Sequence, residues 1–171
     1  MDQENVHSET LPQINIKPVG IIKQISPEIP ELQKGVPGER NRNEASEILI
    51  DDDLCGILDG IEDFSHLFVL YWGHRIPEEK RDITKCHPKG RQDLPLVGVF
   101  STHSPFRPNP ILATVVELLE RKGNVLKVKD LDALDGSPVL DIKTFTKSWC
   151  PSGQVKVPEW VQELHRGNRD L

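Results

Sequence analysis

One stretch of sequence decides the fold: Ile111-Leu-Ala-Thr-Val-Val-Glu-Leu-Leu-Glu-Arg-Lys-Gly-Asn-Val-Leu-Lys-Val-Lys129. Residues 111–119 are rich in β-branched side chains, which favours a strand, although their apolar residues also fit the period of a short helix. Residues 122–124 are typical of a turn, and residues 125–129 alternate between apolar and polar side chains like a half-buried strand. The stretch therefore predicts a β-hairpin.

Short strands are also predicted on both sides of this hairpin. The alternating or apolar segments that favour them are residues 14–25, 44–51, 96–102 and 139–145. An almost continuous apolar run, Phe64-Ser-His-Leu-Phe-Val-Leu-Tyr-Trp72, predicts a central strand buried on both faces, with His66 as a core residue bonded to a backbone carbonyl. Six to seven short strands with few short helices predict a mainly β protein, either a small barrel or a sandwich.

The chain divides into one domain with two extensions. Its 171 residues suit a single core, which we place at residues 14–145. Residues 1–13 are predicted to be a disordered tail. Residues 146–171 form a C-terminal extension, in which residues 158–165 have the apolar spacing of a short amphipathic helix. Residues 54–63 predict a short helix or a turn.

Composition narrows the class of protein. No apolar run approaches the roughly 20 residues that span a bilayer, and residues 1–17 lack the apolar core of a secretory signal, so we expect a cytoplasmic protein with no membrane partner. The three cysteines, Cys55, Cys86 and Cys150, form no C-x-x-C pair, which argues against a disulfide framework and against a metal site. Cys86 is more readily a bystander thiol than a nucleophile.

The net charge of −6 argues weakly against a nucleic-acid partner, but the charge is distributed unevenly. Basic and histidine side chains crowd residues 74–91, whereas acids such as those of residues 51–53 and 130–135 set the overall sign. A local basic patch on an acidic protein can bind phosphate groups. A solvated loop is the equally favoured alternative.

A rigid polar loop follows the segment 96–102. Within Gly98-Val-Phe-Ser-Thr-His-Ser-Pro-Phe-Arg-Pro-Asn-Pro110, three prolines remove three backbone donors and fix three φ angles, so this loop cannot be a helix or a central strand. It nevertheless carries side chains that hydrogen-bond well: His103, Ser104, Arg107 and Asn109. Such a loop is typical of a site that a scaffold positions.

A second polar turn, Asp132-Ala-Leu-Asp-Gly-Ser-Pro138, also follows a predicted strand. The Asp135-Gly136 pair alone is typical of any hairpin. In a small barrel, however, this turn and the proline loop can lie at one rim and form one site. His74 and Arg75 end the aromatic run, and strand ends are suitable places for ligand-binding groups.

Taken together, Gly98–Pro110 and Leu134-Asp-Gly-Ser-Pro-Val-Leu-Asp-Ile-Lys143 resemble the TsaA/TrmO family, and the aromatic run resembles the family's aromatic strand. The likeness covers residues 18–145. The family consists of S-adenosylmethionine-dependent tRNA N6-methyltransferases. The resemblance implies a small mixed-sheet β-barrel, usually a homodimer, that methylates N6 of threonylcarbamoyladenosine at position 37, in the anticodon loop of tRNA.

The resemblance also implies where S-adenosylmethionine binds. By position, the cofactor-binding residues are His74, Arg75, His103, Ala113, Leu134, Asp135, Gly136 and Ser137. The family's early loop contributes as well, and its loose match here is Pro37 to Glu39 within the long irregular loop 26–43. Two departures point to altered cofactor geometry or substrate choice. His103 stands where the family usually has arginine, and Leu112 stands where it usually has glycine.

The implied reaction assigns further roles. Because the acceptor nitrogen must lose a proton, the reaction is expected to use a general base, and the candidates are Asp135 and His103. Arg107 is expected either to hold the threonyl carboxylate of the substrate or to brace its own loop. Phosphate groups of tRNA would be held by Lys80, Arg81, Lys85, Lys89 and Arg91. The alternatives are methylation of a small molecule or another nucleoside, and a non-catalytic nucleotide-binding module.

Overall fold

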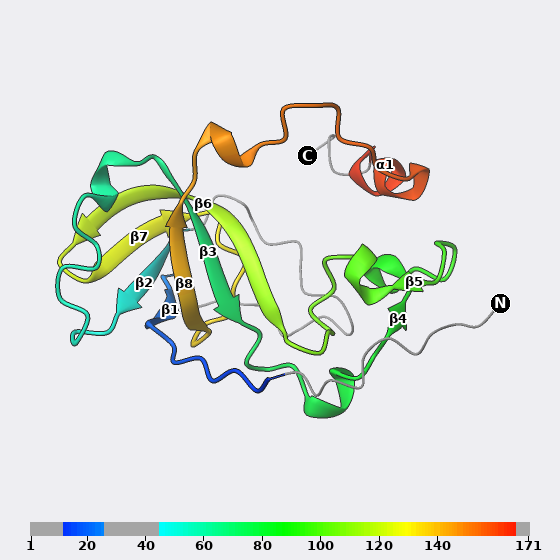
Figure 1. The fold of residues 1–171 in the computed structure, drawn as a ribbon, viewed down its shortest axis with the longest axis horizontal. Helices are drawn as coiled ribbons and strands as arrows, with labels where there is room; N and C mark the ends of the chain where they lie inside the picture. The colour runs from blue at the N-terminus through cyan, green and yellow to red at the C-terminus, as the bar shows by residue number, and fades with distance from the viewer. Residues whose placement is uncertain (1–11, 26–44, 167–171) are drawn as a thin grey trace.

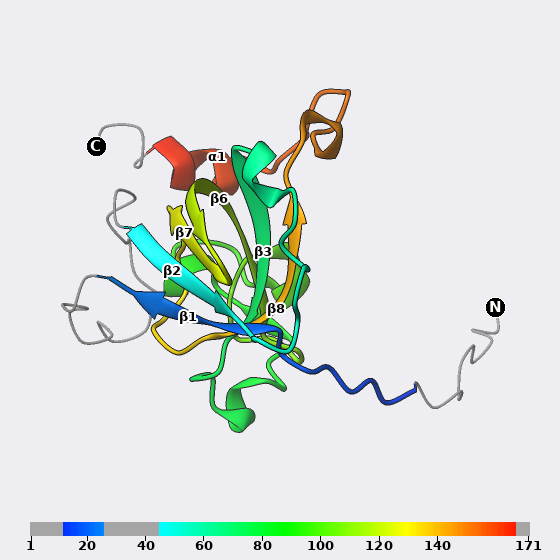
Figure 2. The ribbon, with the colours of Figure 1, turned by 90° about the vertical axis from the view of Figure 1, so that its left-hand side faces the viewer.

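The computed structural model describes residues 12–25 and 45–166. The predicted tail at 1–13 therefore falls almost entirely outside the described residues, as does the expected contribution of Pro37 to Glu39. Six strands close into a barrel in the order β1-β2-β7-β6-β3-β8 (Figures 1 and 2). Their bounds are β1 Gly20–Gln24, β2 Ala45–Ile50, β3 His66–Trp72, β6 Ile111–Lys122, β7 Val125–Lys129 and β8 Pro138–Thr144.

The predicted β-barrel is confirmed, and the sandwich alternative is wrong. All the pairings between the described strands are antiparallel, so the sheet is not the mixed sheet that the resemblance implied. Closure depends on β1 pairing with β8, which joins the beginning and the end of the domain. A closed sheet has no exposed edge, because each strand has hydrogen-bonding neighbours on both sides.

The hairpin in the deciding stretch is confirmed as β6 and β7. Gly123 turns the chain between them with a φ of 58°, a left-handed conformation that glycine adopts easily. β6 continues to Lys122, three residues beyond the predicted end, and its register with β7 shifts between Leu118 and Glu120. A helix over residues 111–119 is therefore wrong, because these residues satisfy their backbone groups in the sheet.

The core fills the interior of the barrel with the inward side chains of each strand. Along β3, Leu67, Val69 and Tyr71 are buried, while the side chains between them are half-buried. The prediction that this strand is buried on both faces is wrong, since only the inner face of a small barrel is fully packed. His66 is exposed, with its Nδ1 2.9 Å from Ser65 Oγ, so its expected place in the core is also wrong.

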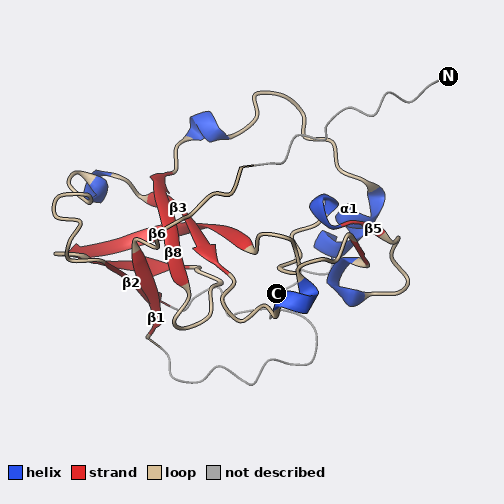
Figure 3. Ribbon diagram, turned by 60° about the horizontal axis from the view of Figure 1, so that its bottom comes forward, coloured by secondary structure: helices blue, strands red, loops and turns tan. Residues whose placement is uncertain are grey.

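A lobe outside the barrel is formed by residues 73–107, between β3 and β6 (Figure 1, right). The strand predicted at 96–102 is mostly wrong: β5 spans only Val97–Gly98, pairs with β4 (Lys85–Cys86), and is followed by a 3-10 turn at Val99–Ser101. Further 3-10 turns lie at Glu78–Lys80 and Pro88–Gly90. Figure 3 shows α1 and the short 3-10 turns as the helical segments of the described residues.

The remaining connections lie around the barrel. Residues 54–63 form turns that end in a 3-10 turn at Ile61–Asp63, as one of the two alternatives predicted. After β8, a 3-10 turn at Lys147–Trp149 places the Trp149 ring 5.9 Å from that of Phe68 on the outside of β3. The predicted C-terminal helix is confirmed as α1 (Glu159–Arg166). Among the described residues, no helix has the length and apolar character to cross a membrane.

Candidate functional site

One end of the barrel collects the segments that the sequence singled out. β3 ends and β6 begins there, since Trp72 pairs with Ile111, and the Gly73 N–H donates to the Pro110 carbonyl over 2.8 Å. The loop from β7 to β8 closes the same end, because Tyr71 near the end of β3 pairs with Val139 at the start of β8. The lobe, the end of the proline loop and the polar turn thus meet around one rim.

The Leu134–Ser137 turn docks on β1. The Gly136 N–H donates to the Ile22 carbonyl over 2.8 Å, and the Ile22 N–H donates to the Ser137 carbonyl over 3.0 Å. A further N–H, that of Gln24, donates to Oδ1 of Asp135 over 3.0 Å. Gly136 has a φ of 78°, which favours glycine at this point of the turn. The turn is therefore an extension of the sheet, and the carboxylate of Asp135 is held by the backbone of β1.

His74 contacts this turn from the end of β3. Its Nδ1 lies 3.2 Å from the hydroxyl oxygen of Ser137, which is almost completely buried. Partial burial lowers the pKa of His74 below its ordinary value of 6.5, the nearby charge of Arg75 lowers it further, and Asp135 partly offsets both. The imidazole is consequently neutral at pH 7. A Cβ added at Gly136 would lie 3.9 Å from His74 Nε2, so the two residues are neighbours.

The proline loop is stiffened by its own arginine. Arg107 donates from Nε to the Ser104 carbonyl over 2.8 Å and from Nη2 to the Thr102 carbonyl over 2.9 Å. The Thr102 and Ser104 hydroxyls in turn accept backbone N–H groups of the loop. Arg107 thus has the bracing role that was one of its two predicted roles, and a role toward substrate stays a prediction.

Besides the exposed Arg75, two of the predicted cofactor residues make no hydrogen bond with the turn. His103 is exposed on the proline loop. Ala113 is exposed on β6, where it pairs with Leu70 on the outer face of the barrel. Successive side chains of a strand point to opposite faces, so Ala113 faces away from its inward neighbour Thr114. The roles of both residues toward a cofactor remain predictions.

Asp132 is a candidate that reasoning from sequence missed. Its Oδ1 accepts hydrogen bonds from the Tyr71 hydroxyl over 2.5 Å and from the Thr114 hydroxyl over 2.6 Å. Tyr71 is buried in the barrel, whereas Asp132 is exposed on the loop that carries Asp135. The available signal was a second carboxylate three residues before Asp135 in the same polar turn. The site therefore holds two positioned carboxylates.

The five predicted phosphate-binding residues are not equivalent. The Arg81 guanidinium lies 5.5 Å from the ring centre of Trp72 and donates to the Ile76 carbonyl, while its Nε is buried and makes no hydrogen bond to the described residues. Arg91 is paired with Asp93, which raises the pKa of the arginine. Lys80 lies 5.0 Å from the ring centre of Phe106. Lys85 and Lys89 are exposed.

Across residues 12–25 and 45–166, no group of three His, Cys, Asp or Glu side chains is placed to hold a metal ion. The fold and site define a small antiparallel β-barrel protein whose candidate binding groups are polar loop residues at one end. The family model for the N-terminal domain of tRNA-methyltransferase O matches residues 29–149. The chain belongs to this TrmO family.

Individual relatives agree with this assignment. A protein of Methanothermobacter thermautotrophicus described as a probable S-adenosyl-L-methionine-binding protein is 44% identical over 134 residues, which cover 78% of this chain and 90% of that protein. The tRNA (adenine(37)-N6)-methyltransferase of Escherichia coli K12 is 41% identical over 90 residues, covering 50% of this chain and 38% of the enzyme.

A solved structure, that of TrmO from Pseudomonas aeruginosa, shares the fold with a TM-score of 0.63 at 22% sequence identity. The match covers 89% of this chain and 63% of that one. The chain therefore spans less than two thirds of the solved TrmO chain, and well under half of the E. coli enzyme.

Proposed function

We propose that the protein is an S-adenosylmethionine-dependent methyltransferase that acts on N6 of threonylcarbamoyladenosine at position 37 of tRNA, as a cytoplasmic homodimer. The observation that carries the proposal is the contact of His74 with Ser137, next to the anchored carboxylate of Asp135. Asp135 and Ser137 belong to the Leu134–Lys143 segment that resembles the TrmO family, and His74 follows the aromatic run. The name of the E. coli relative supports the reaction, and the description of the Methanothermobacter relative supports the cofactor.

The chemistry of the donor set fits S-adenosylmethionine. Asp132 and Asp135 offer carboxylate oxygens that can accept hydrogen bonds from ribose hydroxyls or an amino group, and their charge suits a sulfonium cation. A neutral His74 adds no positive charge against that cation. The cofactor would be held by His74, Arg75, His103, Ala113 and Leu134–Ser137, with Asp132 added. When bound, its sulfonium supplies an electrophilic methyl group.

This chain's own residues would position the acceptor and remove its proton. Proton transfer needs a basic group in reach of the nitrogen, and the candidates are Asp135, His103 and, from its lowered pKa, the neutral His74. Arg107 braces the proline loop through hydrogen bonds from its guanidinium to two loop carbonyls. The same guanidinium would pair with the threonyl carboxylate of the substrate.

The decisive experiment compares tRNA nucleosides from cells with and without the protein by mass spectrometry. We expect the methylated threonylcarbamoyladenosine to vanish without it and to return with the wild-type gene. The Asp135→Ala variant should not restore it, whereas Asp53→Ala, which changes an exposed carboxylate at the opposite end of the barrel, should. A folded protein that shows no S-adenosylmethionine binding by calorimetry would contradict the proposal.

A second candidate is methylation of a small molecule or another nucleoside by the same site. It is favoured by His103 and Leu112, which depart from the family at the proline loop and at β6. Unchanged tRNA together with a methylated product among cellular metabolites would support it. Cofactor binding without any methylated product would instead support a non-catalytic binding module.

A further inference from the structure

An unusual aromatic side chain lies in the lobe, three residues before His103. Phe100 is 82% exposed, which makes it the most exposed large apolar side chain among the described residues. Exposing a phenylalanine leaves much apolar surface in water, where it gains no packing. Isolated exposed apolar residues are common, so the exposure alone assigns no role to Phe100.

The backbone around Phe100 holds the ring outward. Its neighbour Val99 is buried, and the Val99 N–H donates to the Thr84 carbonyl over 2.9 Å. On the other side, the Thr102 hydroxyl and N–H both donate to the Val99 carbonyl, over 2.8 and 3.1 Å. A 3-10 turn anchored on both sides presents the ring with little freedom to fold back. A preorganised ring loses little entropy when a flat partner covers it.

The charge around Phe100 favours an anionic partner. The lobe contains seven Lys and Arg residues but only four Asp and Glu residues, although the net charge of the whole chain is −6. Exposed Lys85 on β4 pairs with Gly98, two residues before Phe100. The other aromatic ring of the proline loop, that of Phe106, already has the Lys80 ammonium over it.

A flat apolar ring beside cations suits an unpaired nucleobase and its phosphate. A specific protein interface buries about 800 Å² on each partner. Leu96 and Phe100 are the only large exposed apolar side chains in the lobe, and these two offer too little apolar surface for such an interface. We propose that Phe100 is a stacking platform for an unpaired base of the RNA substrate, with Lys85 on a neighbouring phosphate. This inference rests on the proposed function and adds a binding residue to it.

The test is the dissociation constant of the full chain for a synthetic RNA stem-loop with an unpaired loop, measured by fluorescence anisotropy at several salt concentrations. Phe100→Ala should weaken binding about tenfold without changing the salt slope, Phe100→Leu should weaken it similarly, and Phe100→Trp should retain it. Lys85→Ala should lower the salt slope by about 1. Phe64→Ala, an exposed phenylalanine near the other end of the barrel, is the matched control.

Three results would overturn the platform: a wild-type chain that does not bind the stem-loop, Phe100→Ala or Phe100→Leu binding as tightly as wild type, or Phe100→Ala converting a dimer into a monomer in sedimentation. The last result would assign the ring to a second copy of the chain. Failure of the proposed function would give a different result. If RNA binding depends on Phe100 but tRNA nucleosides in cells are unchanged, the proposed methylation is contradicted and the proposed stacking role of Phe100 is retained.

Discussion

The Gln24 backbone N–H donates a hydrogen bond to Oδ1 of Asp135 over 3.0 Å, which links β1 to a residue 111 positions later in the chain. The Gln24 side chain strengthens the same link, because its Nε2 donates to the Ala133 carbonyl over 2.7 Å. Its Oε1 accepts from the hydroxyl of buried Ser46 on β2. The first two strands of the barrel therefore fix the position of a carboxylate whose own sequence context is only a turn.

Replacing Asp135 should separate cofactor binding from folding. Asp135→Ala removes one partly buried hydrogen bond, worth about 1 kcal/mol of unfolding free energy, and leaves the barrel pairing intact. We expect S-adenosylmethionine affinity, measured by calorimetry, to fall at least tenfold. Asp53→Ala is the control and should match wild type. Wild-type affinity in Asp135→Ala would show that the binding site lies elsewhere.

The lowered pKa of His74 predicts a dependence of stability on pH. Since the pKa is lower in the folded protein than the ordinary 6.5, unfolded chains take up the proton first as the pH falls. The stability contributed by the neutral imidazole is complete above pH 6.5 and is lost as the pH falls through the folded-state pKa. Denaturant unfolding of wild type and His74→Asn between pH 8 and pH 5 should therefore converge toward acid. Parallel pH profiles would contradict the assignment.

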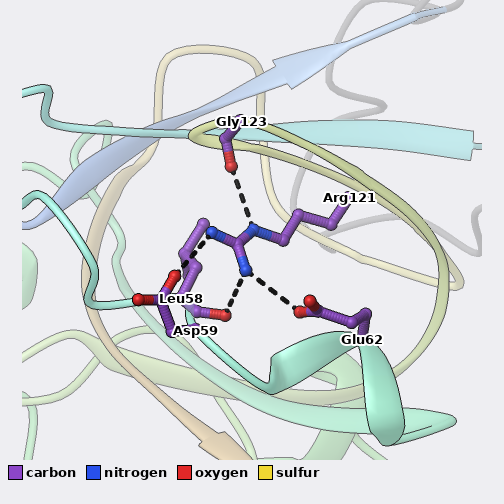
Figure 4. Close-up of polar contacts among 5 residues, drawn as sticks. All are labelled: Leu58, Asp59, Glu62, Arg121 and Gly123. Carbon is purple, nitrogen blue, oxygen red and sulfur yellow. Dashed lines mark hydrogen bonds and ion pairs between the residues drawn. The ribbon is translucent and has the colours of Figure 1, made fainter.

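Arg121 should matter for stability and not for the site. Near the end of β6 it donates to the carbonyls of Leu58 and Gly123 and pairs with Asp59 and Glu62, so one side chain ties three segments together (Figure 4). Arg121→Lys keeps the charge but loses the planar fork. We expect Arg121→Lys to lower the melting temperature by a few degrees and to leave cofactor affinity unchanged. Equal melting temperatures would show that the brace contributes nothing.

The same brace should weaken in acid. A backbone hydrogen bond and the Arg121 guanidinium both lower the pKa of the Glu62 carboxyl. A lowered carboxyl pKa means that the stabilisation is present at neutral pH and is lost as the pH falls through the folded-state value. The difference in melting temperature between wild type and Glu62→Gln should therefore shrink on acidification, as calorimetric scans at several pH values can show.

Local pattern was sufficient for some elements and not for others. The hairpin of residues 111–129 was predictable, because Gly123 and the alternation of β7 act within a few residues of each other. The strand predicted at 96–102 failed because Val99 turns inward to the lobe, an arrangement fixed by the distant Thr84 carbonyl. Barrel closure likewise depends on β1 meeting β8, which no local pattern encodes.

The candidate site divides in the same way. Residues adjacent in sequence, such as those of the Leu134–Ser137 turn, were identified together, and the structure brings His74 to them. Asp132 was missed because its importance comes from Tyr71 and Thr114 on two other strands, whose hydroxyls point at its Oδ1. A count of charges also treats Arg81 as a surface cation, since the Trp72 ring beneath it is not visible in the segment's composition.

Arg81 consequently supports the last prediction, which separates structural from RNA-binding cations. Its guanidinium lies over the Trp72 ring and donates to the Ile76 carbonyl, and its Nε is buried, so the side chain is held against the lobe. Arg81→Gln should lower the melting temperature while leaving the salt slope of tRNA binding unchanged, because that slope counts the phosphates neutralised. Lys85→Gln should do the reverse, with a slope lower by about 1 and an unchanged melting temperature. A reduced slope in Arg81→Gln, measured by filter binding across salt concentrations, would instead return Arg81 to the phosphate contacts.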